Sequence, residues 1–339
     1  MEDKIKFALI GCSRISKKHL EALDELSNKC VLTDVCDLNK DAADTMAAKH
    51  NVNSYYTVQD LHVNSKADCI IIATPSGLHP SQSIQSLEND FHVVTEKPMA
   101  TLYSDAIDMV KVAEKKSKFL FVVKQVRFLE QIVRIKKAID SERFGKIFLI
   151  NVNLFITRPD SYFSESEWRG SKILDGGALL NQSSHFIDLL LWFLGSPEQV
   201  SAFNETLARD IETEDVSVVN VRFKNGALAS INTTILTYPE NLENSVTIIG
   251  EKGTVKLGGK FINKVEKWSF LDDQAYDLKE GDILDFPISH TPFYENVINT
   301  IKGYEKPAVS GKEGIKSMQL IEDCYESSRK KIIIDYSEN

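Results

Sequence analysis

The sequence predicts an α/β protein with two domains: an N-terminal doubly wound parallel sheet, and a C-terminal α+β domain built on a large, open, mostly antiparallel sheet. Over the first 123 residues, short apolar runs alternate with helical patterns, which is typical of parallel strands covered by helices on both faces. Beyond that point, strand-rich segments with hairpin signals take over. We therefore expect domains at residues 1–123 and 124–339.

The first domain opens with KIKFALIG (4–11), an apolar run that ends in glycine, and a helical pattern follows over 12–26. Strand, tight turn and helix form the opening unit of the dinucleotide-binding Rossmann fold. The elements expected after it are, in order, a strand at 30–37, a helix at 38–50, a strand at 67–74, a helix at 77–90, a strand at 91–98, a helix at 104–116 and a strand at 118–123.

The second domain is expected to contain long strands and few helices. The triplets KNG and EKG signal hairpin turns between its strands. Its expected elements are strands within 146–157, 215–237 and 243–259, a helix over 175–195, and late helices at 291–303 and 314–331.

The composition indicates a globular protein with a sizeable core, since 42% of residues are apolar and 26% are charged. No apolar run approaches the ~20 residues that span a bilayer, and the start does not resemble a signal peptide, so the cytoplasm is the expected location. A net charge of −9 argues against nucleic-acid or membrane partners. The cysteines show no metal-binding spacing, so no metal site is expected; they are predicted to be structural thiols, at Cys12, Cys30, Cys36, Cys69 and Cys324.

The turn after the first strand keeps only part of the dinucleotide fingerprint G-x-G-x-x-G. Gly11 holds the first position, while Ser13 and Ser16 replace the other two glycines. A plain strand-to-helix turn is the alternative, but small residues still allow close approach, and a helix N-terminus offers free N–H groups to a pyrophosphate. Asp37, at the end of the second strand, suits the ribose hydroxyls and would repel a 2′-phosphate. The expected cofactor is NAD.

Two more segments follow apolar strands, at the edge where doubly wound sheets bind ligands. They are ATPSGLHP (73–80) and TEKPMA (95–100). Lys97 comes directly after a buried strand, and Pro98 biases it towards an extended backbone.

The predicted helix over 175–195 combines an apolar half with polar residues near its start. At helical spacing, Asn181, Ser184, His185 and Asp188 share one face. One reading places His185 in the core beside Asp188. The other places this face in a substrate pocket, with Asp188 orienting His185.

GCSRIS, ATPSGLH, EKP and the GG…N…H…D pattern together resemble the glucose–fructose oxidoreductase and inositol dehydrogenase family (Gfo/Idh/MocA). The resemblance implies a dehydrogenase in which Lys97 sits between nicotinamide and substrate, and a dimer or tetramer formed through the open sheet. It assigns the cofactor to Gly11, Ser13, Arg14, Ile15, Asp37, Thr74, Pro75, Ser76, His79, Glu96, Lys97 and Gln125.

The segments WRG, DGGALLNQ and SHFIDLL look like one branch of that family, the UDP-N-acetyl-glucosaminuronate 3-dehydrogenases of surface polysaccharide biosynthesis. Another sugar or inositol dehydrogenase, or a sensor that binds NAD or sugar without catalysis, are the alternatives. An anionic UDP-sugar needs cations in its pocket, and Lys124 and Lys172 are expected to supply positive charge there in addition to the arginines given below. The expected substrate contacts are Lys97, Arg127, Arg158, Tyr162, Trp168, Arg169, Asn181, Ser184 and His185.

Lys97 and His185 are the catalytic candidates. His185 has a reference pKa near working pH and suits the role of base. Lys97 is expected to position the hydroxyl, stabilise an alkoxide or act as the base itself. Inositol dehydrogenases of the family typically carry aspartate where this chain has Asn181, which puts a proton relay there in doubt. His290 is a further residue considered as a substrate contact.

Overall fold

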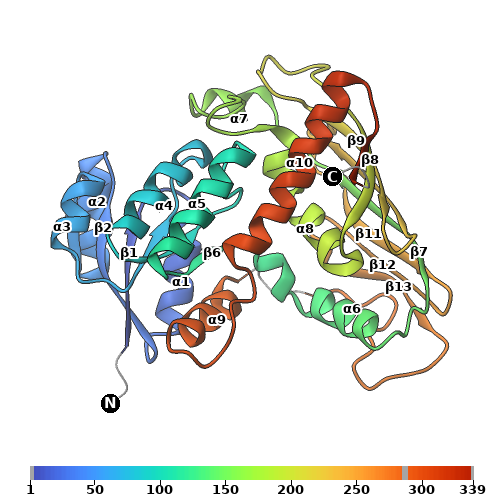
Figure 1. The fold of residues 1–339 in the computed structure, drawn as a ribbon, viewed down its shortest axis with the longest axis horizontal. Coiled ribbons are helices and arrows are strands. Elements are labelled where there is room, and N and C mark those ends of the chain that lie inside the picture. The colour runs from blue at the N-terminus through green and yellow to red at the C-terminus, as the bar shows by residue number, and fades with distance from the viewer. Residues whose placement is uncertain (1–3, 285–288, 337–339) are drawn as a thin grey trace. The chain divides into compact units, whose positions relative to one another are not determined.

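The computed structural model describes residues 4–284 and 289–336, and the chain divides into two compact units (Figure 1). The first unit holds the described residues up to Gln125 together with a later segment that ends at Ile315. The second unit begins at Val126 and resumes at Lys316.

The first unit is built on a six-stranded sheet of parallel strands in the order β3-β2-β1-β4-β5-β6. This order confirms the predicted doubly wound Rossmann sheet. The strands are β1 (Ile5–Ile10), β2 (Cys30–Cys36), β3 (Asn53–Tyr55), β4 (Cys69–Ile72), β5 (His92–Thr95) and β6 (Leu120–Val122). The helices that accompany them are α1 (Ser16–Glu25), α2 (Lys40–His50), α3 (Val58–Asn64), α4 (His79–Glu88) and α5 (Tyr103–Lys116), with the short 3₁₀ turn η1 (Ser76–Leu78). A second 3₁₀ turn, η2 (Gln125–Phe128), begins at the last residue of this stretch, and the rest of it belongs to the second unit.

The pair β3 and α3 escaped prediction. β3 has three residues and no apolar run, and α3 is a seven-residue helix. The Thr57 hydroxyl caps α3 by accepting the N–H of Asp60 at 3.1 Å. Such short elements depend on a cap and on the neighbouring β2 rather than on a periodic pattern of their own.

Helix α9 (Thr291–Ile301) belongs to the first unit, whereas the sequence placed this segment in the second domain. Its buried residues Phe293 and Tyr294 supply the reason. The Tyr294 ring lies edge-on to Phe7 of β1, with ring centroids 5.6 Å apart, and α9 packs against α1. The first domain is therefore discontinuous in sequence.

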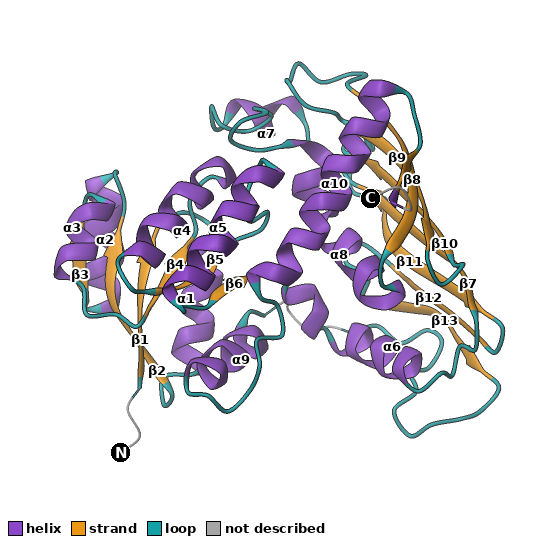
Figure 2. Cartoon of the chain, viewed as in Figure 1, coloured by secondary structure: helices purple, strands orange, loops and turns teal. Residues whose placement is uncertain are grey.

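The second unit contains an eight-stranded sheet in the order β13-β12-β11-β7-β10-β9-β8-β14. Neighbours are antiparallel except β7 and β10, which confirms the predicted mostly antiparallel sheet (Figure 2). The strands are β7 (Ile147–Phe155), β8 (Pro197–Glu205), β9 (Val216–Phe223), β10 (Leu228–Thr234), β11 (Glu243–Gly250), β12 (Gly253–Gly258), β13 (Lys264–Phe270) and β14 (Ile334–Asp335). Its helices are α6 (Glu130–Asp140), α7 (Asp160–Ser164), the π-helical turn η3 (Ala178–Gln182), α8 (Ser183–Leu194) and, from Lys316 onward, α10 (Gly311–Lys330).

The structure also describes the cysteines and the apolar content of the helices. All five cysteines are free, and four are buried, as expected for structural thiols. Among the described residues, no helix has an apolar stretch long enough to cross a membrane.

Candidate active site

The turn between β1 and α1 has the geometry of a dinucleotide-binding turn. Gly11 has φ +97°, and a Cβ there would lie 2.7 Å from the Ala73 carbonyl oxygen, so only glycine fits. The Ser13 hydroxyl donates to that same carbonyl at 3.2 Å, and the Ser16 hydroxyl donates to the Ser13 carbonyl at 2.5 Å. The hydroxyl groups of the two serines therefore stabilise the turn through hydrogen bonds to its backbone.

Asp37 lies beside this turn and is held by the backbone. Its Oδ2 accepts the Cys12 N–H and its Oδ1 accepts the Asn39 N–H, each at 2.8 Å. No described side chain caps the start of α1, where Arg14 is exposed and Ile15 is the N-cap residue. An uncapped helix N-terminus and a fixed carboxylate suit a pyrophosphate and a ribose diol, respectively.

The loops that follow β4 and β5 are joined by His79. Its Nε2 lies 2.8 Å from the Thr74 carbonyl oxygen and its Nδ1 lies 2.8 Å from the Pro98 carbonyl oxygen. His79 is 1% exposed, and both of its ring nitrogens have backbone partners; its cofactor contact stays a prediction. Burial lowers its pKa, while the bonds to Pro98 and Thr74 oppose that effect.

Other predicted cofactor residues lie on the same loops or at the end of β6. The Thr74 hydroxyl donates to Gln82 at 2.6 Å, and Ser76 is buried at the start of η1. Pro75 is the N-cap residue of η1, Lys97 is half-exposed, and Gln125 opens η2.

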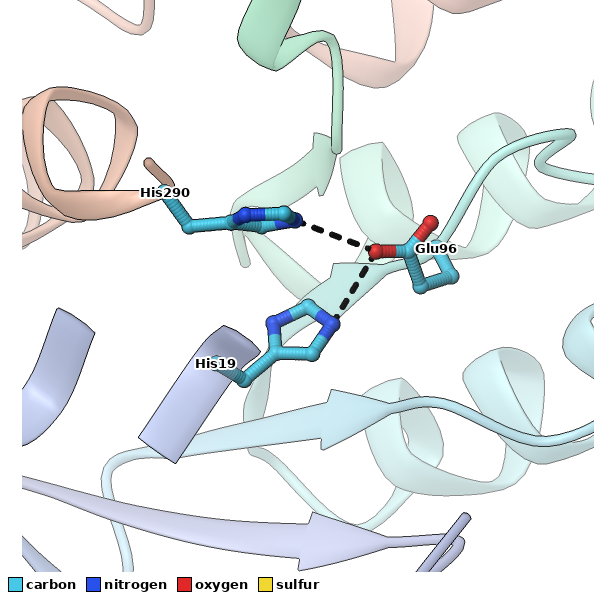
Figure 3. Close-up of side chains that lie close together, drawn as sticks. All are labelled: His19, Glu96 and His290. Atoms are coloured by element: carbon cyan, nitrogen blue, oxygen red, sulfur yellow. Dashed lines mark hydrogen bonds and ion pairs between the residues drawn. The ribbon is translucent and has the colours of Figure 1, made fainter. Parts of the chain in front are cut away.

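Glu96 is a buried carboxylate facing two imidazoles (Figure 3). Its Oε1 lies 3.0 Å from Nε2 of His19 and 3.4 Å from Nε2 of His290, and its Oε2 accepts the Lys97 N–H at 2.9 Å. The predicted cofactor contact of Glu96 and the substrate contact considered for His290 stay predictions. Sequence reasoning missed His19, although a histidine on the buried face of α1 is an unusual core residue.

The same three side chains are of metal-binding types, and their ligand atoms lie within 4.8 Å of one another. Direct contact of Glu96 with both rings accounts for the group without an ion. The Tyr294 hydroxyl lies 2.6 Å from Nδ1 of His19 and occupies its other nitrogen.

In the second unit, the predicted helix over 175–195 begins with the π-helical turn η3 and continues as α8. The wider i→i+5 turn departs from the spacing of three and four on which the predicted shared face depends. Asn181, on η3, is half-exposed, whereas Ser184 and Asp188, on α8, are buried. Ser184 is 1% exposed, which places it within the packed wall and not on an open surface. His185, one residue further along α8, is half-exposed.

Arg127 and Asp188 form a buried ion pair, which sequence reasoning did not foresee. Nε of Arg127 lies 2.7 Å from Oδ2 of Asp188, and its Nη2 lies 2.8 Å from Oδ1. Arg127 is 6% exposed and its guanidinium lies 5.0 Å from the Trp192 ring centre. The partner that the structure shows for Asp188 is thus Arg127, and the substrate contact of Arg127 stays a prediction.

Arg158, Tyr162 and Arg169 do come together. The two guanidiniums lie 5.1 and 4.1 Å from the centre of the Tyr162 ring. Arg158 also donates to Gln182 at 3.3 Å, and Arg158, Tyr162 and Asn181 line one small cavity. The adjoining pocket, between α7 and residues 210–212, includes Arg169. Trp168 is half-exposed, Lys172 is exposed and Lys124 is buried.

Glu214 also lines this cavity and was missed by sequence reasoning. Its Oε1 accepts the Leu179 N–H at 2.6 Å and the Tyr325 hydroxyl at 3.0 Å. A Cβ at Gly177, where φ is +91°, would collide with this carboxylate. Burial raises the pKa of Glu214 to about 7, the bonds from Leu179 and Tyr325 oppose the rise, and the nearby Asp175 adds to it.

Comparisons with known proteins agree with both halves of this description. Residues 5–124 match a family model described as "Oxidoreductase family, NAD-binding Rossmann fold", and residues 136–334 match its "C-terminal alpha/beta domain". The match of the first unit makes it an NAD-binding domain.

Two solved structures are similar over nearly the whole chain. The WlbA dehydrogenase of Chromobacterium violaceum, in complex with NADH and UDP-GlcNAcA, is 43% identical with a TM-score of 0.92; the match covers 99% of this chain and 97% of that one. The WlbA dehydrogenase of Bordetella pertussis, with the same ligands, is 42% identical with a TM-score of 0.92 and coverages of 98% and 99%. A more distant relative, the myo-inositol 2-dehydrogenase of Thermotoga maritima, is 24% identical over 93% of this chain and 94% of its own. The chain belongs to the Gfo/Idh/MocA oxidoreductase family.

Proposed function

We propose that the protein is an NAD-dependent dehydrogenase that oxidises the 3-hydroxyl of a UDP-N-acetyl-glucosaminuronic acid to the 3-keto sugar nucleotide. The observation that carries this proposal is the cluster of Arg158, Tyr162 and Arg169 beside Asn181. Two stacked guanidiniums suit an anionic sugar nucleotide. Whole-chain similarity to proteins crystallised with NADH and UDP-GlcNAcA supports the same substrate.

The fit to NAD rests on the Gly11 turn and on Asp37. Glycine is required at position 11 by the close Ala73 carbonyl, and the Asp37 carboxylate is oriented by two backbone N–H groups. We assign the adenosine ribose to Asp37 and the pyrophosphate to the start of α1. When bound, NAD accepts the hydride that leaves the sugar carbon.

Oxidation also requires residues that remove the proton of the sugar hydroxyl. We assign His185 and Lys97 to it: one takes the proton, and the other holds the oxygen and stabilises its developing charge. Asn181 forms only hydrogen bonds, because an amide does not titrate. The proposal includes a homo-oligomer, dimer or tetramer, a cytoplasmic location and a role in surface polysaccharide biosynthesis.

The test is incubation with NAD and a panel of UDP-hexuronates, UDP-hexoses and inositols, followed through NADH absorbance. A parallel arm contains 2-oxoglutarate, which would reoxidise a cofactor that stays bound. We expect turnover with the UDP-hexuronate, and a fall in kcat of about two or more orders of magnitude in Lys97→Ala and His185→Ala with NAD binding retained. Lys111→Ala, at an exposed lysine of α5, is the matched control.

Oxidation confined to inositols or free sugars would contradict the substrate assignment. That outcome would favour the second candidate, a free-sugar or inositol dehydrogenase, which the similarity to myo-inositol 2-dehydrogenase supports. The pH profiles of the two alanine variants identify the base, because only loss of the base removes the acidic limb of kcat.

A further inference from the structure

Glu96 connects three segments that are far apart in the sequence. His19 comes from α1, His290 is the N-cap residue of α9, and Glu96 directly follows β5 (Figure 3). One carboxylate oxygen faces both rings, and the other accepts the Lys97 N–H. The backbone of Lys97 is therefore bonded to a group whose own position is set by two other elements of the first unit.

The cluster is closed to water. His19 is 0% exposed, His290 2% and Glu96 5%. A buried carboxylate is costly unless it is hydrogen-bonded. Burial raises the pKa of Glu96, but contacts with His19 and His290 outweigh burial and hold that pKa well below its usual range. Glu96 is thus ionised at neutral pH, and the two rings are what keep it so.

The proton positions follow from the neighbours of His19. The ionised Glu96 carboxylate can only accept, so Nε2 of His19, which lies 3.0 Å from it, carries a proton. Burial lowers the pKa of His19, against the effect of Glu96, so the ring is neutral. A neutral ring with its proton on Nε2 accepts at Nδ1, and the Tyr294 hydroxyl, 2.6 Å away and kept protonated because burial raises its pKa, is the donor.

We propose that His19 and His290 are positioning residues, which act through Glu96 to fix the backbone of Lys97 for catalysis. On the other side of Lys97, His79 lies 2.8 Å from the Pro98 carbonyl oxygen, so the segment 96–98 is held from both ends. Lys97 itself is half-exposed. When its backbone is already fixed, its long side chain loses less conformational entropy on reaching the substrate hydroxyl. The inference rests on the proposed function, because that function gives Lys97 its chemistry.

The kinetic test compares two substitutions at one position. Glutamine retains an N–H donor near the place of histidine Nε2, and leucine does not. We expect His290→Leu and Glu96→Gln to lower kcat about ten-fold or more, with the sugar KM and NADH affinity changed less than about three-fold. His290→Gln should keep kcat within about three-fold of wild type. His62→Gln, a half-buried histidine bonded to Ser86, is the matched control and should be unaffected.

Equal losses in His290→Gln and His290→Leu would overturn the positioning role, as would full activity in His290→Leu. A test without sugar separates this inference from the proposed function. In the cofactor-free protein, ¹⁵N spectra of the imidazoles should show His19 protonated at Nε2 only from about pH 6 to 8. Tyr294→Phe should alter that pattern. Titration of His19 near its reference pKa, or stoichiometric zinc in the purified protein, would refute a metal-free cluster with a neutral His19.

Discussion

Replacing Glu214 with glutamine removes a carboxyl group that the second unit holds where a negative charge is unfavourable. Glu214 is 7% exposed, its Oε1 accepts from Leu179 and Tyr325, and Asp175 lies near enough to raise its pKa. Glutamine has nearly the same shape, and its Oε1 can accept the same two bonds. The substitution therefore tests the charge more than the packing.

The size of the effect follows from the pKa, which is about 7 instead of 4.5. At ~1.4 kcal/mol for each pKa unit, ionising Glu214 in the folded state costs about 3 kcal/mol more than in the unfolded chain. Below about pH 4.5 both states are protonated, so the full stability is present. Between about pH 4.5 and 7 the unfolded chain releases the proton first, and this stability is lost as pH rises. Glu214→Gln should lack that loss.

The assay is denaturant unfolding followed by tryptophan fluorescence at several pH values. All three tryptophans, at positions 168, 192 and 268, belong to the second unit, so the signal reports on that unit. Relative to wild type, Glu214→Gln should gain about 3 kcal/mol between pH 4.5 and 8. Glu205→Gln, at an exposed carboxyl group at the end of β8, is the control. Parallel pH curves for wild type and Glu214→Gln would refute the reasoning.

Three further substitutions or conditions test other parts of the structure. Arg127→Leu should destabilise the second unit by about 3–5 kcal/mol in the same tryptophan assay, because it leaves Asp188 as a buried, uncompensated charge; an effect below ~1 kcal/mol would contradict the buried pair. Asp37→Ser should lower kcat/KM for NAD about ten-fold or more and raise kcat/KM for NADP, because the carboxylate that repels a 2′-phosphate is gone. An unchanged ratio of the two kcat/KM values would contradict the assignment of the adenosine ribose to Asp37. Burial lowers the pKa values of His19 and His79, so below about pH 6.5 the unfolded chain takes up protons that the folded first unit does not. Hydrogen exchange of the first unit, corrected for intrinsic rates, should therefore become faster as the pH falls below about 6.5. Protection that does not depend on pH would indicate that both rings bind protons in the folded state.

The sequence was informative where a pattern repeats. Alternating apolar strands and helices predicted the first sheet, because parallel strands buried on both faces are apolar throughout, as CIII of β4 is. Gly11, Asp37 and Lys97 could be proposed from the sequence because each stands within two residues of a strand's end, where such sheets bind ligands. Their positions relative to the sheet follow from connectivity alone.

Contacts between distant residues were not predictable in the same way. Nothing near Arg127 indicates that Asp188, 61 residues later, takes its charge. The chain's return to the first unit at α9 depends on which apolar surface buries Phe293 and Tyr294. Helical spacing also assumes an unbroken α-helix, and the turn η3 breaks it at Asn181. Connectivity along the chain could be predicted, whereas the pairing of side chains such as Arg127 with Asp188 depends on the folded structure.

The asparagine at 181 has a local physical explanation. Resemblance to inositol dehydrogenases leads to an aspartate there, but here Asn181 Nδ2 donates to Oδ1 of Asp175, whose other oxygen accepts the Gly170 N–H at 2.8 Å. Asp175 is 5% exposed and already raises the pKa of Glu214. A third carboxylate at 181 would face two others in a poorly solvated wall, and at least one would bind a proton. An amide satisfies Asp175 without adding charge, and because an amide does not titrate, Asn181 cannot itself serve as a base.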